Sequence, residues 1–143
     1  MFKRVLVPVD GSPGSERAVP YALGVAQALD AEVVVCYVLT TPITANSPSE
    51  ERDASEYVAR IAERFSSASV AAKMMVRRGD PPLEISKAAH EWNVDAIVMA
   101  TRARRRLQKL MLGSVADAVV RDSKLPVLLV PARQAKEAAE GVA

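Results

Sequence analysis

The chain has 143 residues, of which half are hydrophobic and a quarter are charged, and its formal net charge is +2. This length supports one domain with its own core, and the composition is ordinary for a soluble globular protein. The small net charge gives no general case for nucleic acid or an anionic membrane as a partner. No apolar run approaches the roughly 20 residues of a membrane span. The first residues lead directly into an apolar run without a cleavage-like site, so we expect no signal peptide.

Cys36 is the only cysteine in the chain, and it lies in an apolar pattern typical of a strand. A single cysteine cannot form an intramolecular disulfide, so we expect it to be a small buried hydrophobic side chain. This fits the reducing environment of the cytoplasm, which is the location that we expect for the protein.

The first third of the chain predicts a strand, a helix and a second strand. Residues 4–9 form an apolar run that ends at a Gly/Ser/Pro turn, and residues 32–39 are almost wholly apolar. Between them, residues 15–29 carry apolar side chains at helical spacing. The residues expected to face the core from this helix are Ala18, Tyr21, Ala22, Val25, Ala26 and Leu29. Pro20 lies past the first turn of the predicted helix, where it would remove one backbone hydrogen bond.

A second helix is predicted over residues 47–65. Ser47 is expected to be its N-cap, with Pro48 at the first helical position and Glu50 completing a capping box. The residues expected to face the core are Ala54, Tyr57, Val58, Ile61, Ala62 and Phe65.

The second half of the chain continues the alternation. Residues 70–77 predict a third strand, and Asp80 is expected to cap a third helix. The residues expected to face the core from this helix are Ile85, Ala88, Ala89 and Trp92. A short continuous apolar run at Ile97, Val98 and Met99 is typical of a strand that is covered on both faces.

The last elements follow a long basic stretch. Residues 114–122 predict a fourth helix, and residues 127–130 predict a fifth strand. Gly113 and Ser114 form the expected start of that helix, with Ser114 as its N-cap. Free backbone N–H groups and the helix dipole favour an anion at such a start. Residues 132–143 are small, polar and alanine-rich, and we expect a frayed or disordered tail.

The predicted order alternates strands and helices throughout, and nearly every strand is apolar along its whole length. This pattern predicts an α/β fold with a single doubly wound parallel sheet and helices on both faces. Ligands bind such sheets at the carboxyl ends of the strands, where the winding direction reverses. If the first strand neighbours the fourth, residues 10–15 and 100–114 line that crevice.

The sequence resembles the universal stress protein (UspA) family over residues 1–131. The resemblance depends on the order and spacing of short motifs around Asp10, Asp80, Met99, Gly113 and Pro126. It implies the adenine nucleotide alpha hydrolase-like fold, with five strands in the order 3-2-1-4-5. It also implies a homodimer in which the last strands pair across a two-fold axis. The residues of that strand are Val127, Leu128, Leu129 and Val130.

One branch of this family binds ATP, with Mg, through the motif G-x-x-G-x9-G-[ST]. Gly113 and Ser114 match its last two residues, but Ala100 and Ala103 stand where the motif has its first two glycines. Glycine permits a close backbone approach to a ligand or a positive φ angle. An alanine Cβ obstructs both, and a positive φ costs roughly 1 kcal/mol or more. The departure therefore argues against assuming that an adenine nucleotide binds.

The resemblance nevertheless implies a set of nucleotide-contacting positions in this chain. Asp10 would lie by the ribose or base, Pro8 and Val38 would line the adenine, and the residues from Gly113 to Val115 would meet the phosphates. The arginines after the fourth strand could replace some glycine backbone contacts with charge. The full set is Pro8, Asp10, Val38, Met99, Ala100, Arg102, Ala103, Gly113, Ser114 and Val115.

Two of these features have a plainer interpretation from the residues themselves. Asp10 is either a ligand contact or a turn residue at the start of the first helix. The arginine run is a solvated surface or a site for an anion or nucleotide, and a nucleic-acid patch is disfavoured because no aromatic residues interleave it. That run comprises Arg102, Arg104, Arg105 and Arg106.

The sequence offers no catalytic constellation, so we expect no enzyme. It lacks a G-x-x-x-x-G-K-[ST] phosphate loop, and His90 and Cys36 have no plausible partners for a nucleophilic triad or a metal site. The first hypothesis is a non-catalytic stress-response regulator whose crevice binds an adenine nucleotide. The alternative is a dimeric protein-interaction module that has lost nucleotide binding. A third is slow ATP hydrolysis, for which Asp10 is the one candidate base.

Overall fold

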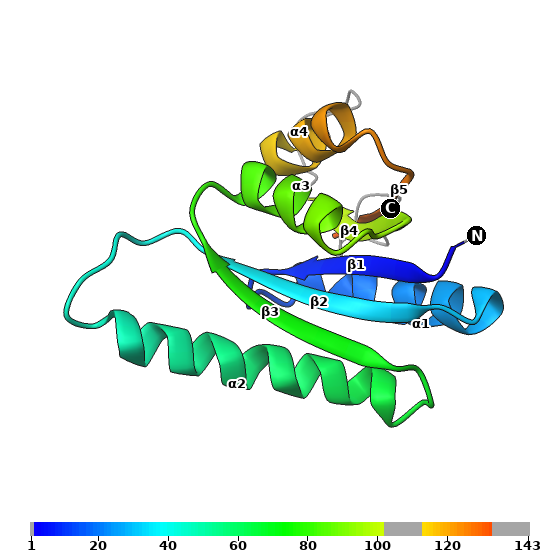
Figure 1. Cartoon of the computed structure of the whole chain (residues 1–143), viewed down its shortest axis with the longest axis horizontal. Coiled ribbons are helices and arrows are strands. Elements are labelled where there is room, and N and C mark those ends of the chain that lie inside the picture. Colours follow the sequence, from blue (N-terminus) through cyan, green and yellow to red (C-terminus); the bar gives the residue numbers. More distant parts are fainter. Residues whose placement is uncertain (1, 102–112, 133–143) are drawn as a thin grey trace, which may run out of the picture.

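A five-stranded parallel sheet forms the centre of the molecule, with helices on both faces (Figure 1). The computed structural model describes residues 2–101 and 113–132. The strands are β1 (Arg4–Val9), β2 (Glu32–Leu39), β3 (Ala72–Arg78), β4 (Ala96–Thr101) and β5 (Val127–Pro131). Their order is β3-β2-β1-β4-β5 and all pairs are parallel. The predicted fold class and strand order are confirmed.

Helices cover both faces of the sheet (Figure 1). The helical elements are the 3-10 turn η1 (Ser15–Arg17), α1 (Ala18–Leu29), α2 (Ser47–Ser66), α3 (Pro81–Glu91) and α4 (Ser114–Ser123). Successive strand residues point to opposite faces, so each strand supplies two separate cores. Val5, Val7 and Val35 pack with α1 and α2, whereas Leu6 and Cys36 pack with α3 and α4. Cys36 is fully buried, as predicted.

The first helix starts later than predicted. Residues 15–17 form the 3-10 turn, and α1 begins at Ala18. Pro20 therefore lies in the first turn, where backbone N–H groups have no intrahelical partner, so the predicted loss of a hydrogen bond does not occur. Tyr21 and Leu29 were expected to face the core but are 54% and 46% exposed. The small alanines of α1 form a narrow buried stripe, which leaves the larger side chains at its margins outside the core.

The predicted capping box at the start of α2 is wrong. Asn46 is the N-cap, and Ser47 is the first helical residue. The Ser47 hydroxyl instead accepts a hydrogen bond from the backbone N–H of Thr44 at 2.7 Å, and the Glu50 carboxylate accepts one from the Thr41 hydroxyl at 2.6 Å. A local serine turn thus competes successfully with the cap.

The third strand and third helix also differ from the predictions in detail. Strand β3 begins two residues later than expected, because Ser69 is left-handed (φ 65°) and the Val70 N–H donates to the Phe65 carbonyl. Residue Asp80 does stand at the N-cap of α3, but its side chain makes no capping hydrogen bond. None of the described helices is long and apolar enough to cross a membrane.

Candidate functional site

A cleft of about 660 Å³ opens at the carboxyl ends of β1, β2 and β4. This volume lies within the range of roughly 300–1,000 Å³ that is usual for small-molecule sites. From β1 the sheet continues through β2 on one side and through β4 on the other. The cleft lies at this switch point, where the winding direction of the doubly wound sheet reverses. The arrangement favours a small ligand that crosses the ends of these three strands.

Eight of the ten predicted site residues line this cleft. They are Pro8, Asp10, Val38, Met99, Ala100, Gly113, Ser114 and Val115. The other two, Arg102 and Ala103, lie outside the described residues, as do Arg104, Arg105 and Arg106. The structure therefore brings together segments from both halves of the chain, but their contact with a ligand stays a prediction.

Ala100 does not adopt a positive φ angle, so its backbone does not need the freedom of a glycine. It lies within β4, in parallel register with Val130 of β5. Among the described residues, the non-glycine positions with positive φ are elsewhere: Asp30, Ser69, Asn93 and Lys124. Only the Cβ of Ala100 is left as an obstacle to a ligand, and that Cβ packs partly against the core beneath α1 and α2.

Gly113, not Ser114, is the N-cap of α4, so this prediction is wrong. The Gly113 carbonyl accepts a hydrogen bond from the Asp117 N–H at 3.0 Å. Its φ of 84° and ψ of 151° place it in a region that is essentially restricted to glycine. The first backbone N–H groups of α4 thus begin at Ser114, beside the cleft, where they and the helix dipole favour an anion.

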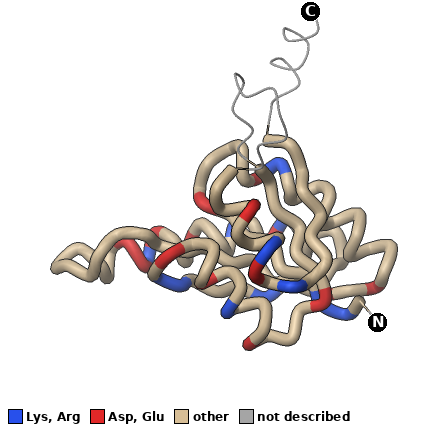
Figure 2. Tube along the Cα trace, turned by 90° about the horizontal axis from the view of Figure 1, so that it is seen from above, with Lys and Arg blue, Asp and Glu red and all other residues tan. Residues whose placement is uncertain are grey.

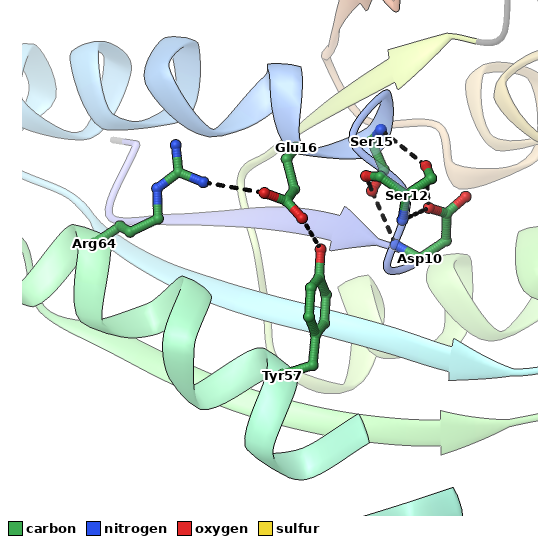
Figure 3. Close-up of polar contacts among 6 residues, drawn as sticks. All are labelled: Asp10, Ser12, Ser15, Glu16, Tyr57 and Arg64. Carbon is green, nitrogen blue, oxygen red and sulfur yellow. Dashed lines mark hydrogen bonds and ion pairs between the residues drawn. The ribbon is translucent and has the colours of Figure 1, made fainter. Parts of the chain in front are cut away.

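The loop after β1 is held by hydrogen bonds around Asp10 (Figure 3). The Asp10 carboxylate accepts from the Ser12 N–H at 2.9 Å and from the Ser12 hydroxyl at 2.5 Å. The Ser15 hydroxyl accepts from the Asp10 N–H at 3.1 Å and donates to the Ser12 carbonyl at 3.0 Å. Asp10 is therefore a turn residue, and its position at the cleft leaves the ligand-contact alternative standing.

Helix α2 supports this loop from the side (Figure 3). The Tyr57 hydroxyl donates to the Glu16 carboxylate at 2.6 Å, and Arg64 lies 3.4 Å from the same carboxylate. Burial and the hydrogen bond to Glu16 both raise the pKa of Tyr57, so its phenol remains a donor. The Tyr57 ring also meets Tyr37 edge-on at 5.7 Å, and Tyr37 lines the cleft.

The sequence analysis named Val38 on the β2 side of the cleft but missed three residues beyond the end of that strand. Thr40, Thr41 and Glu50 line it there. The two threonines follow β2 directly, so the rule that ligands bind at the carboxyl ends of strands was a signal that could have found them. Glu50 comes after the connection between β2 and α2, and no sequence pattern predicts that it lines the cleft.

The family assignment follows from a comparison with known sequences. The universal stress protein family matches residues 1–131. The chain belongs to the universal stress protein family. The resemblance that the motifs indicated is thereby confirmed.

Known universal stress proteins are similar to this chain along nearly its whole length. Universal stress protein MJ0531 of Methanocaldococcus jannaschii is 29% identical over 140 residues, which cover 91% of this chain and 82% of that protein. The solved structure of the hypothetical protein MJ0577 has a TM-score of 0.77 and 26% identity, and covers 94% of this chain and 99% of that chain. The crystal structure of a universal stress protein in complex with cAMP has a TM-score of 0.68 and 26% identity, over 92% and 98% of the two chains.

Within residues 2–101 and 113–132, charged and metal-binding side chains do not gather into a second candidate site. Lysines, arginines and acidic residues are interspersed along the described chain rather than gathered by sign (Figure 2). Within residues 2–101 and 113–132, no group of three His, Cys, Asp or Glu side chains could hold a metal ion. The cleft is thus the feature that any proposal on function must explain.

Proposed function

We propose that this universal stress protein is a non-catalytic stress-response regulator that binds an adenine nucleotide, such as ATP, in the cleft. The observation that carries the proposal is the start of α4 at Gly113, which opens into a ligand-sized cleft at the switch point of the sheet. A relative of 26% identity was crystallised with cAMP, and this supports an adenine nucleotide as the class of ligand.

The residues of the cleft fit the parts of a nucleotide. Pro8, Val38 and Met99 offer apolar walls for a base, and Asp10 offers acceptor oxygens toward a ribose. The N–H groups at the start of α4 suit phosphate oxygens. Mg²⁺ would bind together with the nucleotide, held by its phosphates, because the described residues include no cluster of three His, Cys, Asp or Glu side chains that could hold a metal ion.

The chemistry of the cleft supports a binding role rather than catalysis. The Asp10 carboxylate holds the loop after β1 by accepting from two donors of Ser12, which is a structural role. Burial raises the pKa of the Cys36 thiol to about 12, which keeps it protonated and non-nucleophilic. We therefore propose that the bound nucleotide acts as a signal and not as a substrate.

Thermal unfolding with millimolar Mg-ATP tests the proposal, with ADP, AMP and GTP as comparisons. A ligand at 100 times its Kd stabilises a protein by about 2.7 kcal/mol. In a domain of this size, that raises the midpoint by roughly 5–10 °C. We expect such a rise with adenine nucleotides, and no rise with any nucleotide would overturn the proposal.

The alternative function is a dimeric interaction module that has lost nucleotide binding. The alanine at position 100, which lines the cleft in place of a motif glycine, favours it, and so does the apolar side chain of Leu128, which is 44% exposed on the edge strand β5. We propose that β5 pairs with its copy in a homodimer under either function. Sedimentation should then give about twice the monomer mass of 15.4 kDa, and Leu128→Lys should shift it toward that monomer mass.

Restoring the motif glycines distinguishes the two functions. If the alanines block the nucleotide, the double variant Ala100→Gly, Ala103→Gly should gain nucleotide affinity by tenfold or more. If neither the natural chain nor this variant binds any nucleotide while the dimer persists, the interaction module is the better description.

A further inference from the structure

We propose that Glu50 selects the base of the nucleotide, because its carboxylate accepts a hydrogen bond from the 6-amino group of adenine. This inference rests on the proposed nucleotide binding and adds a specificity-determining residue to that site. Glu50 is a partly buried residue in the first turn of α2 and lines the cleft together with Val38 and Thr41.

Glu50 lies at the end of the cleft that is remote from the start of α4. It meets the sheet beyond β2, whereas α4 starts after β4, and β1 lies between these two strands. Neighbouring strands are about 4.8 Å apart, so β2 and β4 are separated by roughly 10 Å. A nucleotide whose phosphates meet Ser114 therefore extends its base toward Val38 and Glu50. The negative charge of Glu50 also disfavours the reverse orientation, in which phosphates would face a carboxylate.

A chain of hydrogen bonds fixes the Glu50 carboxylate as an acceptor. The Arg78 guanidinium donates to both the carbonyl and the hydroxyl oxygen of Thr41, the latter at 2.9 Å. A guanidinium has no acceptor, so the Thr41 hydroxyl proton is directed to Glu50, at 2.6 Å. Arg78 is itself held 3.5 Å from Glu51 and its side chain is only 16% exposed.

The Glu50 carboxylate retains acceptor capacity after this contact. Within residues 2–101 and 113–132, the Thr41 hydroxyl is the one group that donates to it. A carboxylate has about four acceptor positions on two oxygens. Adenine presents an amino donor at position 6, whereas guanine presents a carbonyl oxygen there, which a carboxylate repels. A carboxylate that faces position 6 thus favours the amino group of adenine over the carbonyl oxygen of guanine.

A purely structural role of Glu50 makes a different prediction. An acidic residue in the first turn of a helix is stabilised by the helix dipole, and this alone would not distinguish one base from another. Glu56 provides a matched control, because it is an exposed residue on the same helix. Glu56→Gln removes the same charge from α2 without touching the contacts between Arg78, Thr41 and Glu50.

Isothermal titration with two triphosphates tests the inference. ATP and purine riboside 5′-triphosphate differ only in the 6-amino group, so the ratio of their Kd values isolates its recognition. Hydrogen bonds to a charged acceptor are roughly twice as strong as neutral ones, so we expect the natural chain to prefer ATP by about tenfold. In Glu50→Gln the preference should fall to about threefold or less, and Thr41→Val should weaken it partly. Glu56→Gln should leave it unchanged.

The outcomes separate this inference from the proposed function. If Glu50→Gln binds both triphosphates and keeps the tenfold preference, the inference is wrong while the proposed function stands. If the natural chain binds neither triphosphate, the proposed function is wrong and the inference falls with it. The unfolding midpoints without nucleotide should agree to within about 2 °C among the four proteins, which shows that any change in preference does not arise from misfolding.

Discussion

Two hollows of similar volume lie at opposite ends of the sheet, about 660 Å³ at the carboxyl end and about 690 Å³ at the amino end. At the amino end the protein pairs its own polar groups. The Asp95 carboxylate accepts from the backbone N–H groups of Lys3 and Arg4, at 2.7 and 3.0 Å. The Arg4 guanidinium pairs with Glu32 and with the Trp92 carbonyl. At the carboxyl end, the first N–H groups of α4 lie beside the cleft, and the Glu50 carboxylate, which also lines it, accepts a hydrogen bond from Thr41. Two hollows of similar volume thus differ in how their polar groups are used, so volume alone does not identify a site.

The backbone conformation of the turns also differs between the two ends of the sheet. Each turn from a helix into a strand contains a left-handed residue that is not glycine, and these residues are Asp30, Ser69, Asn93 and Lys124. Positive φ in the turns from a strand into a helix belongs to glycines, which are Gly11, Gly79 and Gly113. Side chains are thus tolerated in the turns of the amino end. At the carboxyl end, Gly113 lines the cleft, and a Cβ at Gly11 would contact the Tyr37 side chain.

At neutral pH, the largest expected effect on stability comes from removing Asp95, which pairs with backbone groups at the amino end of the sheet. Asp95→Ala removes the acceptor of two backbone N–H groups, and hydrogen bonds to charged groups contribute about 1.5–3 kcal/mol. We expect the free energy of unfolding to fall by about 2–3 kcal/mol in urea denaturation, with nucleotide affinity unchanged. Asp53→Ala, at an exposed position of α2, should change it by less than about 0.5 kcal/mol. An equal loss in both variants would remove the distinction between the two ends.

The next largest effect is expected from a substitution that strains the backbone at the start of α4, at the carboxyl end of the sheet. Gly113→Ala places a Cβ at a φ of 84° and ψ of 151°, which costs about 1–3 kcal/mol unless the backbone moves. Such a movement displaces the first N–H groups of α4, so nucleotide affinity should fall by about tenfold or more in calorimetric titration. Gly24→Ala is the control, because a Cβ there meets nothing within 4 Å. It should leave the affinity unchanged and stabilise α1 by roughly 0.5–1 kcal/mol.

Stability measured over a range of pH tests the burial of Cys36, which lines the cleft. Burial raises the pKa of Cys36 from 9.0 to about 12, so the unfolded thiol ionises first. Its contribution to stability is complete below pH 9 and is lost as the pH rises toward 12. In this window the free energy of unfolding of the natural chain should fall more steeply than that of Cys36→Ala, by up to about 1.4 kcal/mol per pH unit. Parallel curves would show that the thiol is not buried as described.

The smallest expected effect is a gain in stability from a substitution in the turn between α4 and β5, at the amino end of the sheet. Lys124 is exposed and left-handed, with φ at 59°, so Lys124→Gly should stabilise the protein by roughly 0.5–1 kcal/mol. The thermal midpoint should rise by about 2–4 °C, without a change in nucleotide affinity. Lys124→Ala keeps the Cβ and should give no gain, and a gain there would show that the side chain and not the φ angle is responsible.

The sheet was predictable from the sequence because its strands are covered on both faces. The predicted bounds of the first two strands, residues 4–9 and 32–39, match β1 and β2, since continuous apolar runs can satisfy only such a position. The caps at Ser47 and Ser114 were not predictable in the same way. One hydrogen bond decides each cap, and in each case a neighbouring residue became the N-cap.

The candidate site was predictable only where it belongs to the strand ends. Asp10 and Met99 follow from the rule on carboxyl edges, and Gly113 from the motif before the last helix. Glu50 and Tyr57 reach the cleft or its loop from α2, and their contacts with Thr41 and Glu16 depend on how that helix packs. No local pattern in the sequence encodes that approach.

The burial of Cys36 makes the chain convenient for labelling. Its only thiol is fully buried and has a raised pKa, so maleimide reagents should not react with it in the folded protein. A cysteine introduced at an exposed rim position, such as Thr40, would then be the single reactive group. One fluorophore there would report occupancy of the cleft in real time, without first removing the native cysteine from the core.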